Sequence, residues 1–226
     1  MSGVSPTRSA LVAAFVLAFV LAATGGLTGC AGLGQRVDRS LLDGVPNEEK
    51  LLLFDAENGV YIAKDEMETA ERALRDAERA LARARDYDDV IDARKKSGAV
   101  VDTPEVLALL EEWNDARIEV RKAEVAYMKQ KRETAEARLW ASRARYEHAK
   151  AKLVKDHNPE DGTDIDLEGF SGQVTDKEAV EAEKQAALVE REKVVSEKRA
   201  LYNKLSDQLQ KRSNGAYGGP WADLVD

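Results

Sequence analysis

The stretch from Leu53 to Ile91, "LFDAENGVYIAKDEMETAERALRDAERALARARDYDDVI", carries the strongest structural pattern in this chain. Apolar and small residues recur in it at spacings that alternate between three and four, the signature of a left-handed coiled coil. Charged residues fill the positions between them, as solvated helix faces require. The row consists of Leu53, Ala56, Val60, Ala63, Met67, Ala70, Leu74, Ala77, Leu81, Ala84, Asp88 and Ile91.

The row predicts one long helix over residues 48–96. It passes through Gly59 in phase, so we expect an unbroken helix although a mid-helix Gly costs about 1 kcal/mol relative to Ala. Gly98 follows Lys95 and Lys96. A Gly after two cations is typical of a helix C-terminus.

A second helix is predicted over residues 104–155. Thr103 is a candidate N-cap, Pro104 suits the first helical position and Glu105 suits the positive helix start. Apolar positions fall on roughly opposite sides of this helix. The first row is Val106, Leu109, Trp113, Ala116, Val120, Ala123, Tyr127, Gln130, Thr134, Ala137, Ala141, Ala144, His148 and Ala151, and the second is Val125, Met128, Ala135, Leu139, Tyr146, Ala149 and Leu153.

A helix that is apolar on two sides needs two partners. We expect the first row to face helix 48–96 and the second to face a third helix over residues 175–212. Thr175 with Glu178 would form a capping box at the start of that third helix. The predicted fold is therefore all-α, an elongated antiparallel coiled coil of three long helices within residues 47–212. The alternative is a helical hairpin that oligomerises through its exposed stripe.

Composition excludes several classes of function. The net charge is −8, charged residues make up 34% of the chain and aromatic residues 6%. Because cations are interleaved with acids, we expect no nucleic-acid binding. No Gly-rich phosphate loop, nucleophilic triad or zinc spacing is present, so we expect neither an enzyme nor a cofactor or small-molecule substrate. His148 lies in a helix row, where a packing role is the expectation.

The loop predicted over residues 156–174 gathers carboxylates in "DHNPEDGTDIDLEGFSG". Such a cluster could hold Ca²⁺, which takes six to eight oxygen ligands. Its spacing does not match an EF-hand loop, and a solvated turn rich in Pro, Gly and Asp is the simpler interpretation.

The first 29 residues have the plan of a signal peptide. Arg8 precedes an uncharged run from Ala10 to Ala23, which is shorter than the roughly 20 residues of a membrane-spanning helix. A short anchor that stays attached is the alternative. The run ends in Leu27-Thr28-Gly29-Cys30, which resembles the bacterial lipobox, the motif at which lipoprotein signal peptides are cleaved.

The lipobox resemblance implies that Cys30 becomes the first mature residue and carries a diacylglycerol thioether and an N-acyl chain. Two or more acyl chains anchor a protein firmly to a membrane. The alternative is a chance cysteine after an ordinary signal peptide. Ala31 follows the cysteine, and in enteric lipoproteins a residue other than Asp there favours the outer membrane. Residues 30–46 would form a lipidated N-terminus and tether.

Residues 213–226 form a Gly-rich tail that ends in the apolar residues Pro220, Trp221, Leu224 and Val225. An apolar patch on a flexible segment could dock into a groove on a partner. The alternatives are a disordered tail and a strap that folds back onto the helices.

These features predict a lipid-anchored periplasmic coiled coil that acts as a structural, scaffolding or docking component of the cell envelope. Its expected partners are the membrane, through the lipid, and a protein or a second copy, through the helices. The general plan resembles murein lipoprotein, but this chain ends in Asp226 where that family ends in the Lys that is joined to peptidoglycan. The alternative function is a helical periplasmic chaperone or an accessory subunit of an efflux or secretion assembly.

Overall fold

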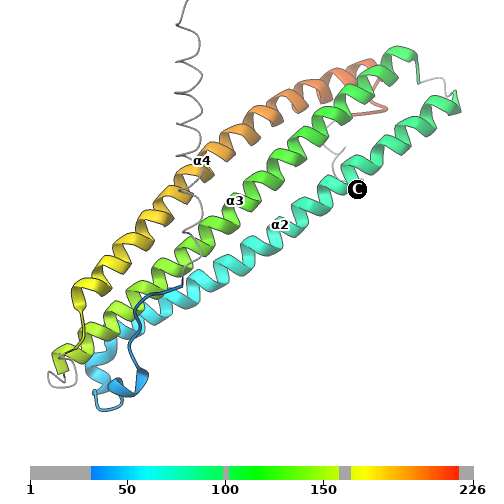
Figure 1. Cartoon of the computed structure of the whole chain (residues 1–226). Helices are drawn as coiled ribbons and strands as arrows, with labels where there is room; N and C mark the ends of the chain where they lie inside the picture. Colours follow the sequence, from blue (N-terminus) through cyan, green and yellow to red (C-terminus); the bar gives the residue numbers. More distant parts are fainter. Residues whose placement is uncertain (1–31, 99–101, 158–163, 219–226) are drawn as a thin grey trace, which may run out of the picture.

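Three long helices form an elongated layer in the computed structural model, which describes residues 32–98, 102–157 and 164–218. Two short 3-10 turns, η1 (Arg39–Leu42) and η2 (Asn47–Lys50), precede α2 (Leu51–Ser97), α3 (Pro104–His157) and α4 (Leu167–Arg212). The helices run up, down and up, with α3 in the middle (Figure 1). The predicted all-α coiled coil of three long helices is confirmed. Within the described ranges, no helix has both the length and the hydropathy that crossing a bilayer requires.

The end of α2 and the start of α3 are formed by the residues that the sequence predicted for these positions. Gly98 adopts φ = 64°, the left-handed conformation that ends α2. The hydroxyl of Thr103 accepts a hydrogen bond from the Val106 amide at 3.3 Å, which caps α3. Buried residues of α2 all come from the heptad row, and they are Leu53, Ala63, Ala70, Ala84 and Ile91.

The middle helix packs along both of its neighbours, whereas α2 and α4 have almost no contact with each other in the described part of the chain. The three helices therefore form an open layer and not a closed three-helix bundle (Figure 1). One side of α3, which is flanked by α2 and α4, is therefore not covered by another described helix.

The first row of α3 meets both neighbouring helices, whereas the prediction assigned it to α2 alone; Trp113 in this row packs against Tyr87 of α2 and Tyr202 of α4. In the first row, the side chains of Gln130 and Thr134 donate hydrogen bonds to the Lys184 carbonyl of α4, at 3.2 and 3.1 Å. In the second row, burial and the nearby charge of Glu57 in α2 raise the pKa of Tyr146. A row with a seven-residue repeat drifts by about 20° per heptad around a straight α-helix, so one long row can meet α2 at one place and α4 at another.

Helix α4 begins at Leu167, so the predicted start at Thr175 and the predicted loop over 156–174 are wrong at this boundary. Asp166 is the actual N-cap, because its carboxylate accepts from the Gly169 amide at 3.0 Å. Thr175 lies inside the helix, where its hydroxyl donates to the Ser171 carbonyl at 3.1 Å. Phe170 is buried in the core, and its burial outweighs the weak helix propensity of the neighbouring glycines.

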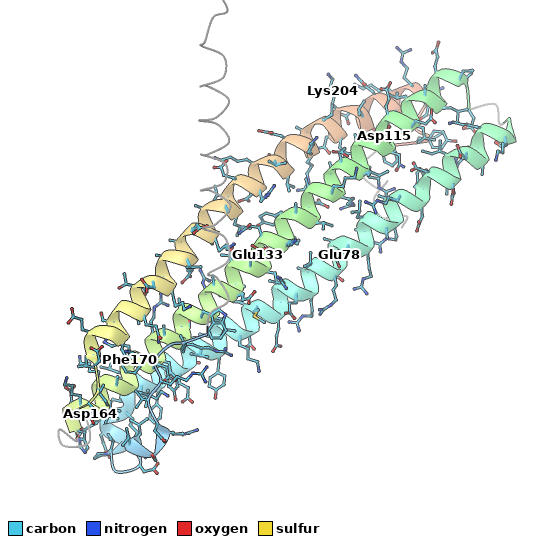
Figure 2. The ribbon with its side chains drawn as sticks, in the orientation of Figure 1. Glu78, Asp115, Glu133, Asp164, Phe170 and Lys204 are labelled. Carbon is cyan, nitrogen blue, oxygen red and sulfur yellow. The ribbon has the colours of Figure 1, made fainter. Side chains whose placement is uncertain are left out.

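Two apolar core clusters lie at the two ends of the layer. At the end that holds Phe170 (Figure 2), the N-terminal segment joins the helices, and the cluster comprises Val37, Leu42, Val45, Leu53, Ala151, Val154 and Phe170. At the opposite end Trp113 packs against Tyr87 and Tyr202, with ring centroids 6.0 and 5.7 Å apart. Between these ends, residues 121–133 of α3 include no buried residue. The molecule is therefore tightly packed at its ends and open in its middle.

The segment predicted as a tether is docked against the helices from Gln35 onward, which corrects that prediction. We call residues 35–46 the N-terminal strap. The Val37 amide donates to a Glu147 carboxylate oxygen at 2.9 Å, and the Lys150 ammonium donates to the Val37 carbonyl at 3.2 Å. The Gln173 side chain accepts from the Gln35 amide and donates to its carbonyl. Pairing of both backbone groups of Gln35 and of Val37 fixes the first residues of the strap against α3 and α4.

The start of the predicted flexible tail also folds back onto the helices. Tyr217 is buried, its hydroxyl donates to Asp102, and Arg94 donates to the same hydroxyl at 2.8 Å. The alternative of a strap is therefore correct for residues 213–218. Pro220, Trp221, Leu224 and Val225 lie outside the described residues.

Candidate functional site

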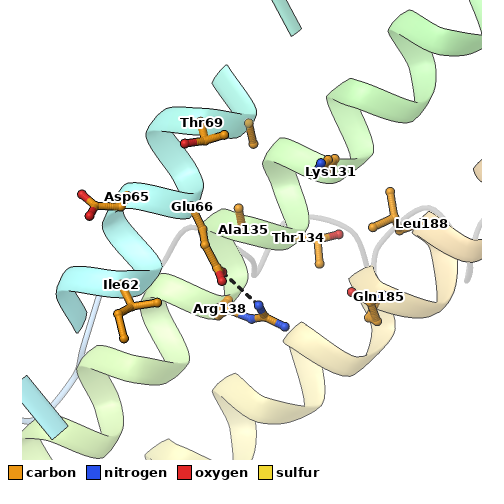
Figure 3. Close-up of a pocket in the computed structure, with 11 residues that line it drawn as sticks. Ile62, Asp65, Glu66, Thr69, Lys131, Thr134, Ala135, Arg138, Gln185 and Leu188 are labelled. Atoms are coloured by element: carbon orange, nitrogen blue, oxygen red, sulfur yellow. Dashed lines mark hydrogen bonds and ion pairs between the residues drawn. The ribbon is translucent and has the colours of Figure 1, made fainter. Parts of the chain in front are cut away.

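An open groove runs along the middle of α3 between α2 and α4. It consists of two consecutive hollows, of about 490 and 830 Å³, which follow the same three helices. Figure 3 shows the first hollow, in which Ile62 and Thr69 come from α2, Ala135 from α3 and Leu188 from α4. We call the two hollows together the α3 groove.

The floor of the α3 groove combines a charged row with apolar neighbours. Glu124, Lys131 and Arg138 recur every seven residues and therefore lie on one face of α3. Tyr127 and Met128 lie between them in the second hollow. A surface of this kind can accept apolar side chains and pair with charges at the same time.

The walls of the α3 groove are built from small and aliphatic residues. Ala73, Ala77 and Ala80 form the wall on α2, and Leu188 and Val195 stand on α4. Alanine side chains leave room for another helix to approach closely. Of these three alanines only Ala77 belongs to the heptad row that predicted the coiled coil.

Arg138 links all three helices across the floor of the groove. Its guanidinium donates to Glu66 of α2 (Figure 3) and to Glu181 of α4, each at 2.9 Å. These two hydrogen bonds raise the pKa of Arg138, first through Glu181 and then through Glu66. Glu124 on the floor similarly accepts from Arg199 of α4 at 2.6 Å. Exposed ion pairs contribute about 0–1 kcal/mol each, so they orient the walls without sealing the groove.

The shape and lining of the groove suit the docking of another segment. Within the described residues, no group of three or more His, Cys, Asp and Glu side chains could hold a metal ion. His157 lies at the end of α3, where its Nδ1 is 2.8 Å from Glu49. His148 is half-buried in the first row. In the loop considered for Ca²⁺, Asp166 serves as the α4 cap.

None of the site residues predicted from the sequence is among the residues that the structure describes. Leu27, Thr28, Gly29 and Cys30 are outside the described residues, as is the apolar end of the tail. The sequence prediction missed the groove itself. A charged residue at every seventh position of α3 was the available signal, because it marks a face that neither apolar row occupies.

Comparison with known proteins returns no relative. No protein-family model, no curated protein and no solved structure matches this chain. A function is therefore supported by the groove, the two straps and the lipobox-like motif alone.

Proposed function

We propose that this protein is a lipid-anchored docking protein of the bacterial cell envelope. In this proposal Cys30 carries the lipid, the helical layer faces the periplasm, and the α3 groove receives a helical segment of a partner protein. The outer membrane is the favoured location because Ala31 follows the cysteine. The main support for the docking role is the open groove between α2 and α4. These two helices have almost no contact with each other in the described part of the chain.

A helix is the occupant that the groove fits best. An amphipathic helix can lay its apolar face against Tyr127, Met128 and the alanine wall while its flanks pair with rim charges. The layer would then become a four-helix arrangement, in which each helix has neighbours on two sides. The half-exposed middle of α3 would become buried.

Photo-crosslinking in intact cells tests the docking role. A photoreactive amino acid at Thr69, an exposed residue of the groove wall, is expected to capture a protein from the envelope. Glu78 is the matched control, since it is exposed on the same helix and heptad counting places it on the flank away from the groove. Equal capture from both positions, or none from Thr69, would contradict the docking role.

The alternative function, a helical chaperone or an accessory subunit of an efflux or secretion assembly, draws on the apolar side chains in the same groove. A chaperone would suppress aggregation of unrelated unfolded proteins and would yield many crosslinked species from Thr69. A docking protein would yield one dominant species and would leave aggregation unchanged. Crosslinking and an aggregation assay on the same preparation separate the two.

A further inference from the structure

The first turns of α2 are apolar on the face that points away from α3. Leu51, Phe54 and Tyr61 are 65%, 46% and 60% exposed, whereas the equally exposed Ile62 lines the α3 groove. At 100° per residue the first three lie within about a quarter of the helix circumference, on the side away from the buried Leu53 and its row. We call these three residues the outer patch. A helix with two apolar faces needs two partners, and α3 covers only one face.

The outer patch is confined to one end of the molecule. Beyond Tyr61 the same face of α2 continues with Arg72 and Arg79, both exposed. Val90, near the far end of this face, is 41% exposed and has charged neighbours. A patch that only reflected loose packing would have no reason to stop after three turns.

The end that holds the outer patch is also where the chain leaves for Cys30. Leu53 shares one core cluster with Val37 of the N-terminal strap, and the strap is fixed from Gln35 by its bonds to Gln173. Five residue steps separate Cys30 from Gln35, and an extended chain of that length spans at most about 17 Å. A lipid on Cys30 would therefore hold this end close to the membrane.

We propose that the outer patch rests in the bilayer surface that receives the Cys30 lipid, so that the far end of α2 is held away from the membrane. The inference rests on the lipid anchor of the proposed function. Phe54 and Tyr61 are of the residue types that suit the interface between hydrocarbon and headgroups. Exposed Glu48, Glu49 and Asp55 lie beside the patch, which favours a zwitterionic surface over an anionic one.

Fluorescence quenching in vesicles tests the orientation. Cys30 is the only cysteine, so Phe54→Cys and Val90→Cys can each be labelled with an environment-sensitive dye in the processed full-length product. The two sites lie on one helix face, about 54 Å apart at 1.5 Å per residue. In phosphatidylethanolamine–phosphatidylcholine vesicles, we expect a lipid-borne quencher to act several-fold more strongly at position 54 than at 90, and aqueous iodide to act in the opposite order.

Three results would overturn the proposal. Equal access of iodide to both positions would show that the outer patch stays in water. Protection of position 54 from both quenchers would indicate a protein or a second copy on the patch. Equal lipid quenching at both positions would indicate a molecule lying flat.

The unsubstituted protein separates failure of the orientation from failure of the anchor. With Cys30 lipidated it has no thiol to react and takes up no dye. Dye uptake by it would overturn the anchor, and the orientation with it. No uptake together with iodide-accessible position 54 would overturn the orientation alone.

Discussion

Glu147 and Lys150 show how single residues hold the chain end that leads to Cys30. Both are buried charges on α3, they are ion-paired at 2.7 Å, and between them they satisfy the backbone of Val37. Removing one partner of a buried pair leaves the other charge uncompensated. The pair therefore holds the strap together with the burial of Val37, Leu42 and Val45.

We predict that Lys150→Ala lowers the free energy of unfolding by about 2–4 kcal/mol and releases the N-terminal strap. Hydrogen exchange at the Val37 amide should accelerate to the rate of an open segment. Lys152→Ala is the matched control, since Lys152 is exposed two residues away and should change neither quantity. An unchanged exchange rate in Lys150→Ala would show that the pair does not hold the strap.

A second prediction concerns Tyr217 and alkaline pH. Burial and the hydrogen bond to Asp102 raise the pKa of Tyr217 above its usual value of 10.0. Because the folded state binds the phenol proton more tightly, the contribution of the Tyr217 hydroxyl to the free energy of unfolding is complete below pH 10. It is lost as the pH rises through the pKa of the folded state. Tyr217→Phe should cost about 1–2 kcal/mol at pH 8 and less at pH 11. Urea unfolding of both proteins at pH 8 and pH 11 checks this prediction. A difference in unfolding free energy between Tyr217→Phe and the unsubstituted protein that is the same at both pH values would contradict it.

At the scale of the helix, the start of α4 gives a third prediction. Asp166→Ala should destabilise the protein by about 1 kcal/mol, because it removes the side chain that accepts from the Gly169 amide. Thr175→Ala is the contrasting variant and should be neutral or slightly stabilising, since Ala is the better residue inside a helix. Chemical denaturation of the two variants decides between the observed cap and the capping box predicted at Thr175. A larger loss of unfolding free energy in Thr175→Ala than in Asp166→Ala would favour the predicted capping box.

The elements that could be predicted from sequence are those fixed by local rules. The heptad row set the extent of α2, Gly98 set its end, and Thr103 with Pro104 set the start of α3. Helix α2 continues through Gly59 because the packing of neighbouring residues against α3 outweighs the effect of one weak helix former.

What could not be predicted depends on contacts between distant segments. The α4 start depends on Phe170 meeting the N-terminal strap, and the strap depends on Glu147 and Lys150. On α4, half-buried Glu181 and Lys184 pair with α3, so ion pairs contribute to the contact between these two helices. No local pattern distinguishes such residues from a solvated face.

For the whole molecule, the groove gives a fourth prediction. Ala73→Arg places a bulky cation on the groove wall and should reduce crosslinking of the partner from Thr69 at least tenfold. The free energy of unfolding should change by less than about 1 kcal/mol, because Ala73 is only half-buried. Glu78→Arg, the matched control on the other flank, should leave capture intact. Undiminished capture in Ala73→Arg would exclude the groove as the docking surface.

The lipid on Cys30 is the part of the account on which the envelope location, the partner class and the membrane orientation all depend. The intact mass of the protein purified from its native membranes tests it most directly. We predict a chain that begins at Cys30 and is heavier than residues 30–226 by a diacylglyceryl group and an acyl chain. A mass equal to the full chain, with residues 1–29 still attached and a free thiol on Cys30, would contradict the account.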